Sequence, residues 1–201
     1  ITDKWLFELT NKFIENSKAN YEKQRFYLVV KDFENYVDDL SNWYIRINRR
    51  RFWKSENGID KKNAFYSLFY ALKTVTQVMA PIVPFITEYV WQNLLVCYDS
   101  NLPHSVHLSS YPKESDYVIT DNIINITNYT RNIITIALKM RNENNIKVRQ
   151  PLSKLYIQTK YDLSEYYPVI KSELNVKDLD IVDNFDNLKT GYLELNFKNA
   201  G

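Results

Sequence analysis

The chain has 201 residues, of which 45% are hydrophobic and 25% are charged, and its net charge is +2. These values are typical of a globular protein with one or two domains. The chain has only three glycines, and this scarcity favours long helices over a turn-rich β-sandwich. The single cysteine, Cys97, excludes an internal disulfide and favours a reducing compartment, and no apolar run reaches the ~20 residues that span a membrane. The chain opens with Ile1 rather than Met and without a signal peptide, so we expect a piece of a longer protein.

The first 53 residues carry apolar side chains at helical spacing. Leu6, Leu9 and Phe13 predict a helix over residues 3–20, with Thr2 or Asp3 at its start. A second helix is predicted from about residue 25 to 53, because seven apolar positions lie within about 60° of one line on a helical wheel: Phe26, Val30, Phe33, Val37, Leu40, Tyr44 and Ile47. We expect the last five of these side chains to be mostly buried.

Residues 41–54, at the end of this helix, hold the positive charge of the chain. Five of these fourteen residues are Lys or Arg, and three are Trp or Tyr. The segment carries +5 and the whole chain +2, so the other 187 residues sum to −3. Guanidinium groups hold phosphates while flat rings stack on unpaired bases, which favours contact with a phosphodiester strand. The alternative is a solvated, charged helix face with the aromatic rings packed beneath it.

The helical wheel divides this basic segment between two sides. The side away from the apolar line carries or borders five residues: Asn42, Arg46, Arg49, Arg50 and Trp53. Arg46 and Arg49 are expected to be exposed there. Arg51 projects onto the apolar side, where it must reach solvent or meet a carboxylate from the next helix. We therefore expect Arg51 to be more buried than the other two and to have a structural role.

Two further helices are predicted over residues 61–79 and about 84–96, separated by a break at Pro81 and Pro84. The second is apolar almost all round, so we expect it at the centre of the bundle. Residues 97–116 are predicted to form a loop that holds His104 and His107. This pair is a weak metal signal without a third ligand nearby, and we predict no metal site.

The pattern changes in the last third of the chain. A helix is predicted over residues 119–143, and its end runs into a second, weaker basic locus over 139–152 that includes Lys147 and Arg149. From residue 153 onward, strands are predicted at 155–158, 178–182 and 191–197, with a short helix at 163–174. The predicted fold is mainly α: a helical bundle over residues 1–150, followed by a small α/β unit over 151–201, which a longer chain would complete.

Residue patterns for catalysis are absent from the sequence. Three glycines cannot build a phosphate-cradling loop, and Cys97 lies in an apolar helix end, where it is expected to be buried filler. The tandem Asp38 and Asp39 diverge by about 100° on a helix, so they do not form a carboxylate pair. We predict that this chain has no active site.

Five motifs, in order along the chain, resemble the anticodon-binding region of the isoleucyl-tRNA synthetases, which are class Ia aminoacyl-tRNA synthetases. Residues 40–46 (LSNWYIR) with 49–53 (RRRFW) are similar to the signature helix of that region. Residues 79–88 (MAPIVPFITE) resemble a segment shared with the valyl and leucyl enzymes. Residues 105–108 (SVHL) with Tyr111 and Pro112 match a family element that usually has Trp in place of Tyr111. Residues 147–152 (KVRQPL) and 173–177 (ELNVK) match downstream landmarks.

The resemblance implies that the helical bundle binds the anticodon stem-loop of tRNA(Ile) and that the α/β part is a downstream junction domain. The expected tRNA-binding residues come from both basic segments: Asn42, Arg46, Arg49, Arg50, Trp53, Lys54, Lys147 and Arg149. The family's ATP-binding motifs and editing domain lie N-terminal to this region. The resemblance therefore implies a non-catalytic part of an isoleucine–tRNA ligase, with ATP and Mg²⁺ bound elsewhere in the full-length enzyme and no cofactor here.

The expected partners are tRNA(Ile) and the N-terminal catalytic and editing domains of the same chain, in a cytoplasmic monomer without membrane contact. Two alternatives stay open. The first is the equivalent domain of a valyl-tRNA synthetase, which the triple arginine before Phe52 and Trp53 disfavours. The second is a helical protein-interaction module whose basic face docks an acidic partner. Preference for tRNA(Ile) over bulk tRNA would separate RNA binding from protein binding.

Overall fold

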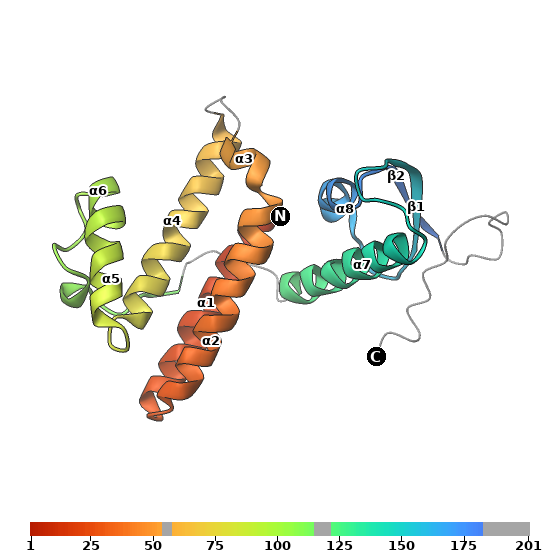
Figure 1. Cartoon of the computed structure of the whole chain (residues 1–201). Helices are drawn as coiled ribbons and strands as arrows, with labels where there is room; N and C mark the ends of the chain where they lie inside the picture. Colours follow the sequence, from red (N-terminus) through yellow and green to blue (C-terminus); the bar gives the residue numbers. More distant parts are fainter. Residues whose placement is uncertain (54–57, 115–121, 183–201) are drawn as a thin grey trace. The chain divides into compact units, whose positions relative to one another are not determined.

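The computed structural model describes residues 1–53, 58–114 and 122–182 (Figure 1). They fall into two compact units, one over residues 2–123 and the other from Ile124 onward. The predicted domain limits of 1–150 and 151–201 differ from this division, which places the last long helix with the sheet. Compact packing is not the same property as a functional domain, so those limits stay a prediction.

An antiparallel helical hairpin forms the base of the first unit. α1 (Thr2–Glu22) leads into α2 (Phe26–Asp38) through a tight turn in which Gln24 has a φ of 54°. α4 (Ile59–Met79) packs beside α1 (Figure 1). The hairpin buries large apolar side chains from both helices: Trp5, Leu6, Phe7, Phe13, Ile14, Val29 and Tyr36. In this core the Thr10 hydroxyl donates to the Leu6 carbonyl at 2.7 Å, so it accepts from the Tyr36 hydroxyl, which lies 2.7 Å away.

The helix predicted over residues 25–53 is present but not regular along its length. α2 continues into η1 (Asp39–Ile45), which is π-helical, and α3 (Arg49–Trp53) follows after a turn at Asn48. A π-helical turn bonds residues five apart rather than four, so it rotates every later side chain relative to a regular wheel. The basic segment therefore begins inside an irregular stretch of helix.

The burial predicted from a regular wheel is correct at Leu40 and Tyr44 and wrong at Val37, which is 39% exposed. Phe33 and Ile47 are half-buried. The π-helical stretch supplies the reason. It contains one extra residue, so the residue that lines up with buried Tyr44 is Tyr36, eight positions earlier, and not Val37. A regular helix would set Tyr36 and Tyr44 about 80° apart, whereas both are buried in the protein.

The helix predicted at the centre of the bundle has an apolar side on the surface instead, which corrects that prediction. It consists of α5 (Pro84–Val90), η2 (Trp91–Leu95) and α6 (Val96–Tyr98). Trp91 and Leu95 are fully buried and cluster with Ala80 and Val106. The opposite side is apolar yet exposed, and Phe85 is 90% exposed. Apolar content alone did not reveal that only one side of this helix has a partner in the described part of the chain.

The loop after α6 is held against α5 by hydrogen bonds. The Glu88 carboxylate accepts from Ser105 Oγ at 2.9 Å and from the Val106 amide at 3.0 Å. The Trp91 indole donates to the Pro103 carbonyl at 2.8 Å. A short 3₁₀ turn, η3 (Val106–Leu108), follows within the loop. These bonds give residues 103–106 a defined path against the helix.

The second unit contains a parallel β-α-β arrangement beside a long helix. Its elements are α7 (Ile123–Glu143), β1 (Leu152–Gln158), η4 (Ser164–Tyr166), α8 (Tyr167–Leu174) and β2 (Val176–Val182). The strands pair in parallel from Leu152 opposite Val176 to Gln158 opposite Val182. Buried Ile157 and Ile170 lie in its core, and the Thr127 hydroxyl of α7 bonds the Tyr166 hydroxyl. α7 is thus part of this unit.

The predicted fold class, mainly α with a small α/β unit, is confirmed. In the described residues, strands occur only at 152–158 and 176–182, later in the chain than every helix of the first unit. The strand predicted at 191–197 and the start of the helix predicted at 119 lie outside the described residues. No helix within the ranges 1–53, 58–114 and 122–182 is both long and apolar enough to cross a membrane.

Candidate nucleic-acid interface

Arg51 anchors the basic segment of the first unit. Its Nη1 and Nη2 donate to the two carboxylate oxygens of Asp3 at 2.8 and 2.7 Å. Its Nε donates to Asp60 Oδ2 at 3.0 Å, and Nη1 also donates to Asn48 Oδ1 at 3.0 Å. Of the two alternatives predicted for Arg51, reaching solvent or meeting a carboxylate from the next helix, the structure shows the second, with Asp60 of α4. Asp3 of α1 adds a second carboxylate, so this side chain ties three helices together.

The charges in this network stabilise one another. Burial opposes ionisation of Asp3, but hydrogen bonds from Arg51 and Tyr44 outweigh it and lower the pKa of the Asp3 carboxyl. Burial likewise opposes the charge of Arg51, while Asp3 and Asp60 together raise the pKa of its guanidinium. The Tyr44 hydroxyl donates to Asp3 Oδ1 at 2.8 Å, and burial is the chief reason why the pKa of this phenol is raised. Arg51 is therefore a structural cation rather than one offered to a ligand.

Asn42 lies within η1, and Arg46 is the first residue after it, about one helical turn further along the chain. Both are exposed, as predicted for Arg46. The Asn42 amide donates to the Asp38 carboxylate, and Arg46 Nε donates to the Asn42 carbonyl at 2.9 Å. The guanidinium carbon of Arg46 lies 6.0 Å from the ring centroid of Trp43, which is buried. These contacts hold Arg46 close to its own helix, with its charge at the surface.

Arg49, Arg50 and Trp53 are exposed on α3. Trp53 is 78% exposed, which is unusual for an indole and is not explained by packing within the described residues. Neither arginine forms an ion pair with any residue that the structure describes. Lys54, the remaining predicted binding residue of this segment, lies outside the described residues. α3 thus presents two guanidinium groups and a flat ring within five residues, a set suited to phosphates and an unpaired base.

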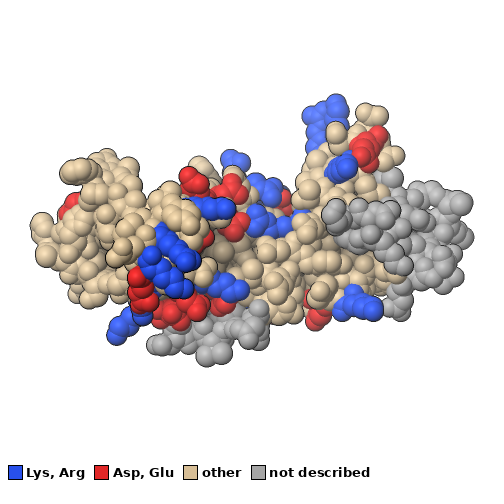
Figure 2. All heavy atoms as spheres, turned by 90° about the horizontal axis from the view of Figure 1, so that it is seen from below, with Lys and Arg blue, Asp and Glu red and all other residues tan. Residues whose placement is uncertain are grey.

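Charges of both signs are interspersed on one face of the protein. On the face drawn in Figure 2, Lys and Arg side chains lie beside Asp and Glu, and broad areas carry no charge. This agrees with the net charge of +2. On this face, therefore, positive charge is not spread over the surface as a general property.

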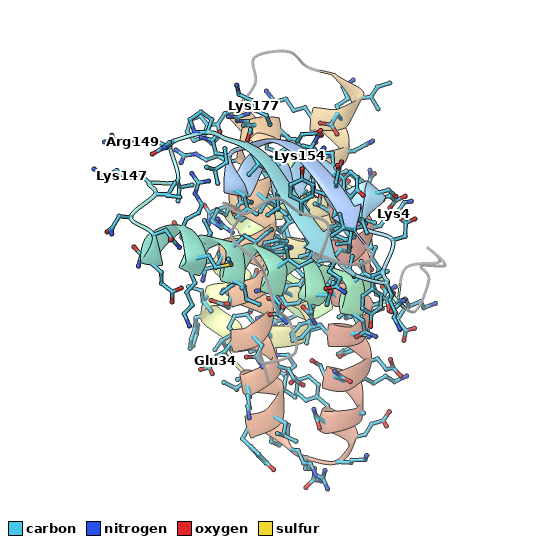
Figure 3. All side chains as sticks on the ribbon, turned by 90° about the vertical axis from the view of Figure 1, so that its right-hand side faces the viewer. Lys4, Glu34, Lys147, Arg149, Lys154 and Lys177 are labelled. Carbon is cyan, nitrogen blue, oxygen red and sulfur yellow. The ribbon has the colours of Figure 1, made fainter. Side chains whose placement is uncertain are left out.

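Lys147 and Arg149 belong to the second unit, where they lie on the loop between α7 and β1. Both are exposed, and Figure 3 shows their side chains projecting away from the ribbon. Two residues of this unit that the sequence did not single out bond the backbone of the same loop. They are Arg141, which is buried, and Asn175, which is half-buried. The loop is a second candidate contact, separate in sequence from the first.

The residues that could support other chemistry are scattered. Within residues 1–53, 58–114 and 122–182, no group of three or more His, Cys, Asp or Glu side chains is placed to hold a metal ion. His104 and His107 are both exposed. Cys97 is exposed as well, so the expectation that it is buried filler is wrong. It lies near the end of a helix whose apolar side faces outward, and apolar neighbours in sequence did not bury it.

Comparison of the chain with known proteins shows which family it belongs to. The family model described as "Anticodon-binding domain of tRNA ligase" matches residues 3–157. The match includes α1 to α7 and nearly all of β1, so it holds both basic segments.

Individual relatives point the same way. The chain is 36% identical over 198 residues to an isoleucine–tRNA ligase of Clostridium kluyveri and 37% identical over 199 residues to that of Clostridium tetani, in each case covering 98% of this chain and 19% of the relative. It is 36% identical over 208 residues to the isoleucine–tRNA ligase of Cutibacterium acnes, covering all of this chain and 18% of the relative. The resemblance drawn from the five motifs is confirmed, and the chain spans about a fifth of the length of these curated relatives.

Proposed function

Because the chain belongs to the family of anticodon-binding domains of tRNA ligases, we propose that it recognises the anticodon stem-loop of tRNA(Ile) as the non-catalytic part of an isoleucine–tRNA ligase. The observation that carries the proposal is the exposed set of Arg49, Arg50 and Trp53 on α3. Arg51 anchors that helix to Asp3 and Asp60, so the set is presented from a fixed support.

The proposed contacts divide by chemistry. Arg46, Arg49 and Arg50 hold phosphates of the loop, because a planar guanidinium matches two phosphate oxygens at once. Trp53 stacks on an unpaired base, and Asn42 offers an amide that can read a base edge. Lys54, Lys147 and Arg149 add further backbone contacts. Phosphate contacts fix the register of the RNA, and the base contacts supply the preference for one anticodon.

The remainder of the ligase completes the proposed activity. We place ATP and Mg²⁺, and the catalytic and editing domains, in the four-fifths of the relatives' length that this chain does not match. We further propose that the enzyme acts in the cytoplasm as a monomer. The chain alone is expected neither to activate isoleucine with ATP nor to hydrolyse mischarged tRNA.

A competition assay tests the proposal. A fluorescent anticodon stem-loop of tRNA(Ile) is bound to the 201-residue chain and displaced with unlabelled tRNA(Ile) or with bulk tRNA depleted of it. Base contacts are worth about 1–3 kcal/mol each. We therefore expect tRNA(Ile) to displace the probe at a concentration at least about tenfold lower than the depleted bulk tRNA requires. A tRNA(Val) competitor as effective as tRNA(Ile) would favour the valyl alternative. Absence of RNA binding would overturn the proposal and leave the protein-interaction alternative.

A further inference from the structure

The loop that carries Lys147 and Arg149 has its backbone carbonyls bonded from the interior of the second unit. Arg141 Nη2 lies 2.7 Å from the Lys147 carbonyl and 3.3 Å from that of Val148, and it also donates to Gln150. The Asn175 amide donates to the carbonyls of Val148 and Arg149 at 3.1 and 3.0 Å. Four successive carbonyls, from residue 147 to 150, thus accept from these two side chains.

Arg141 is an unusual residue to find beneath a loop. It lies in the last turn of α7 and is only 3% exposed. It forms no ion pair with a carboxylate among the residues that the structure describes, and within the same residues its Nε and Nη1 have no hydrogen-bond partner. A buried guanidinium without a counter-charge is costly. Because this guanidinium bonds the carbonyls of the loop, its positive charge lies directly under the loop. There it adds to the charges of Lys147 and Arg149.

Asn175 has a backbone conformation that few other residues adopt. It follows α8 with a φ of 49°, in the left-handed region, where Asn and Gly are favoured. This conformation ends α8 and starts β2 one residue later. The amide of the same residue reaches the loop, so one position both shapes the crossover and bonds residues 148 and 149.

We propose that Arg141 and Asn175 are positioning residues for a preformed RNA-backbone site made by Lys147 and Arg149, an inference that rests on the proposed function. Bonding the carbonyls inward turns their negative ends away from an approaching phosphate and leaves the two cationic side chains outward (Figure 3). A loop already held in this shape loses less conformational entropy when RNA binds. The buried charge of Arg141 raises the positive potential at the same place.

Asn175→Gly tests this most cleanly, because glycine keeps the left-handed backbone conformation while removing the amide. Affinity for a complete tRNA(Ile) transcript is measured on the 201-residue chain for wild type, Asn175→Gly, Arg149→Ala and the double variant. Asn175→Gly should weaken binding about two- to tenfold, the effect of a lost phosphate contact or hydrogen bond. In the Arg149→Ala background the same change should have less effect, because residues that act through one another are not additive.

Two further measurements complete the test. Lys160→Ala removes an exposed lysine of the same unit away from this loop and should leave the affinity nearly unchanged. Trypsin should cut after Lys147 and Arg149 faster in Asn175→Gly than in wild type, because the loop opens more often. Faster cleavage with unchanged affinity would show that Asn175 holds the loop only for stability, and equal losses in both backgrounds would show that Asn175 does not act through Arg149. Either outcome would overturn the inference, while binding of the stem-loop by wild type would still support the proposed function.

Discussion

The guanidinium of Arg51 holds both carboxylate oxygens of Asp3, at 2.8 and 2.7 Å, although 48 residues separate them in sequence. This pair joins the first turn of α1 to α3. Three adjacent arginines consequently have different surroundings: Arg49 and Arg50 are exposed, and Arg51 is tied into the fold. The composition of a basic run is thus an incomplete guide to which of its cations can reach a ligand.

Loss of the Asp3 carboxylate should destabilise the first unit. Asp3→Asn removes the charge opposite a partly buried Arg51, and hydrogen bonds to charged groups predict a loss of about 1–3 kcal/mol in the free energy of unfolding. Asp60→Asn is the matched control, because the Asp60 side chain is 73% exposed and exposed pairs contribute about 0–1 kcal/mol. Urea unfolding followed by circular dichroism measures both. Equal losses for the two variants would contradict the assignment of Asp3 as the main anchor.

The same pair should make stability depend on pH in a defined direction. The pKa of Asp3 is lowered in the folded protein from its usual value of 3.8, so the unfolded chain binds the proton more tightly than the folded one. The stabilisation is fully present above that value and is lost as the pH falls through the lower folded pKa. The difference in unfolding free energy between wild type and Asp3→Asn should be constant from about pH 7 to 5 and shrink at lower pH. A difference that grows on acidification would show that the sign is wrong.

Arg49 should contribute to RNA binding through its charge. If it neutralises one phosphate, Arg49→Ala should weaken binding of the tRNA(Ile) stem-loop and flatten the slope of log affinity against log salt by about 0.7–0.9. Different tRNAs should lose affinity to a similar extent, because a phosphate contact carries no sequence information. Lys12→Ala removes an exposed lysine of α1 outside the basic segment and provides the control. Equal slopes for wild type and Arg49→Ala would exclude a phosphate contact at this position.

The sequence predicted the fold where its patterns were governed by local spacing. The helical wheel predicted that Arg51 would be more buried than Arg46 and Arg49, and the structure agrees. It did not predict the π-helical stretch at residues 39–45, in which Trp43 and Tyr44 are both buried, because a regular wheel assumes the same turn throughout. Because of this turn, the buried line through Tyr44 reaches back to Tyr36 instead of to Val37, which is exposed.

The charged residues of the second candidate contact were predicted from the sequence, but the two residues that hold its loop were not. Lys147 and Arg149 are evident in the sequence, whereas Arg141 was counted only as part of a basic locus. A signal was available, since Arg141 lies four residues after the buried Ala137 on α7 and therefore near the buried line of that helix. Asn175 had a weaker signal, because Asn after a helix often has the left-handed conformation. Its reach to residues 148 and 149 depends on the crossover between the strands, which sequence spacing does not give.

Trp53 should contribute to RNA binding without releasing counterions. Stacking on one base is worth roughly 1–3 kcal/mol and involves no phosphate, so Trp53→Ala should lower the affinity for the tRNA(Ile) stem-loop about 5- to 150-fold and leave the salt slope nearly unchanged. Trp53→Phe retains a smaller ring and should recover part of the loss. Because the side chain is 78% exposed, neither variant should alter the circular dichroism spectrum or the free energy of unfolding appreciably. Fluorescence anisotropy across a salt series measures affinity and slope together. An unchanged affinity for Trp53→Ala would remove the indole from the interface, and a flattened slope would mean that the substitution displaced the neighbouring arginines instead of removing a stacked ring.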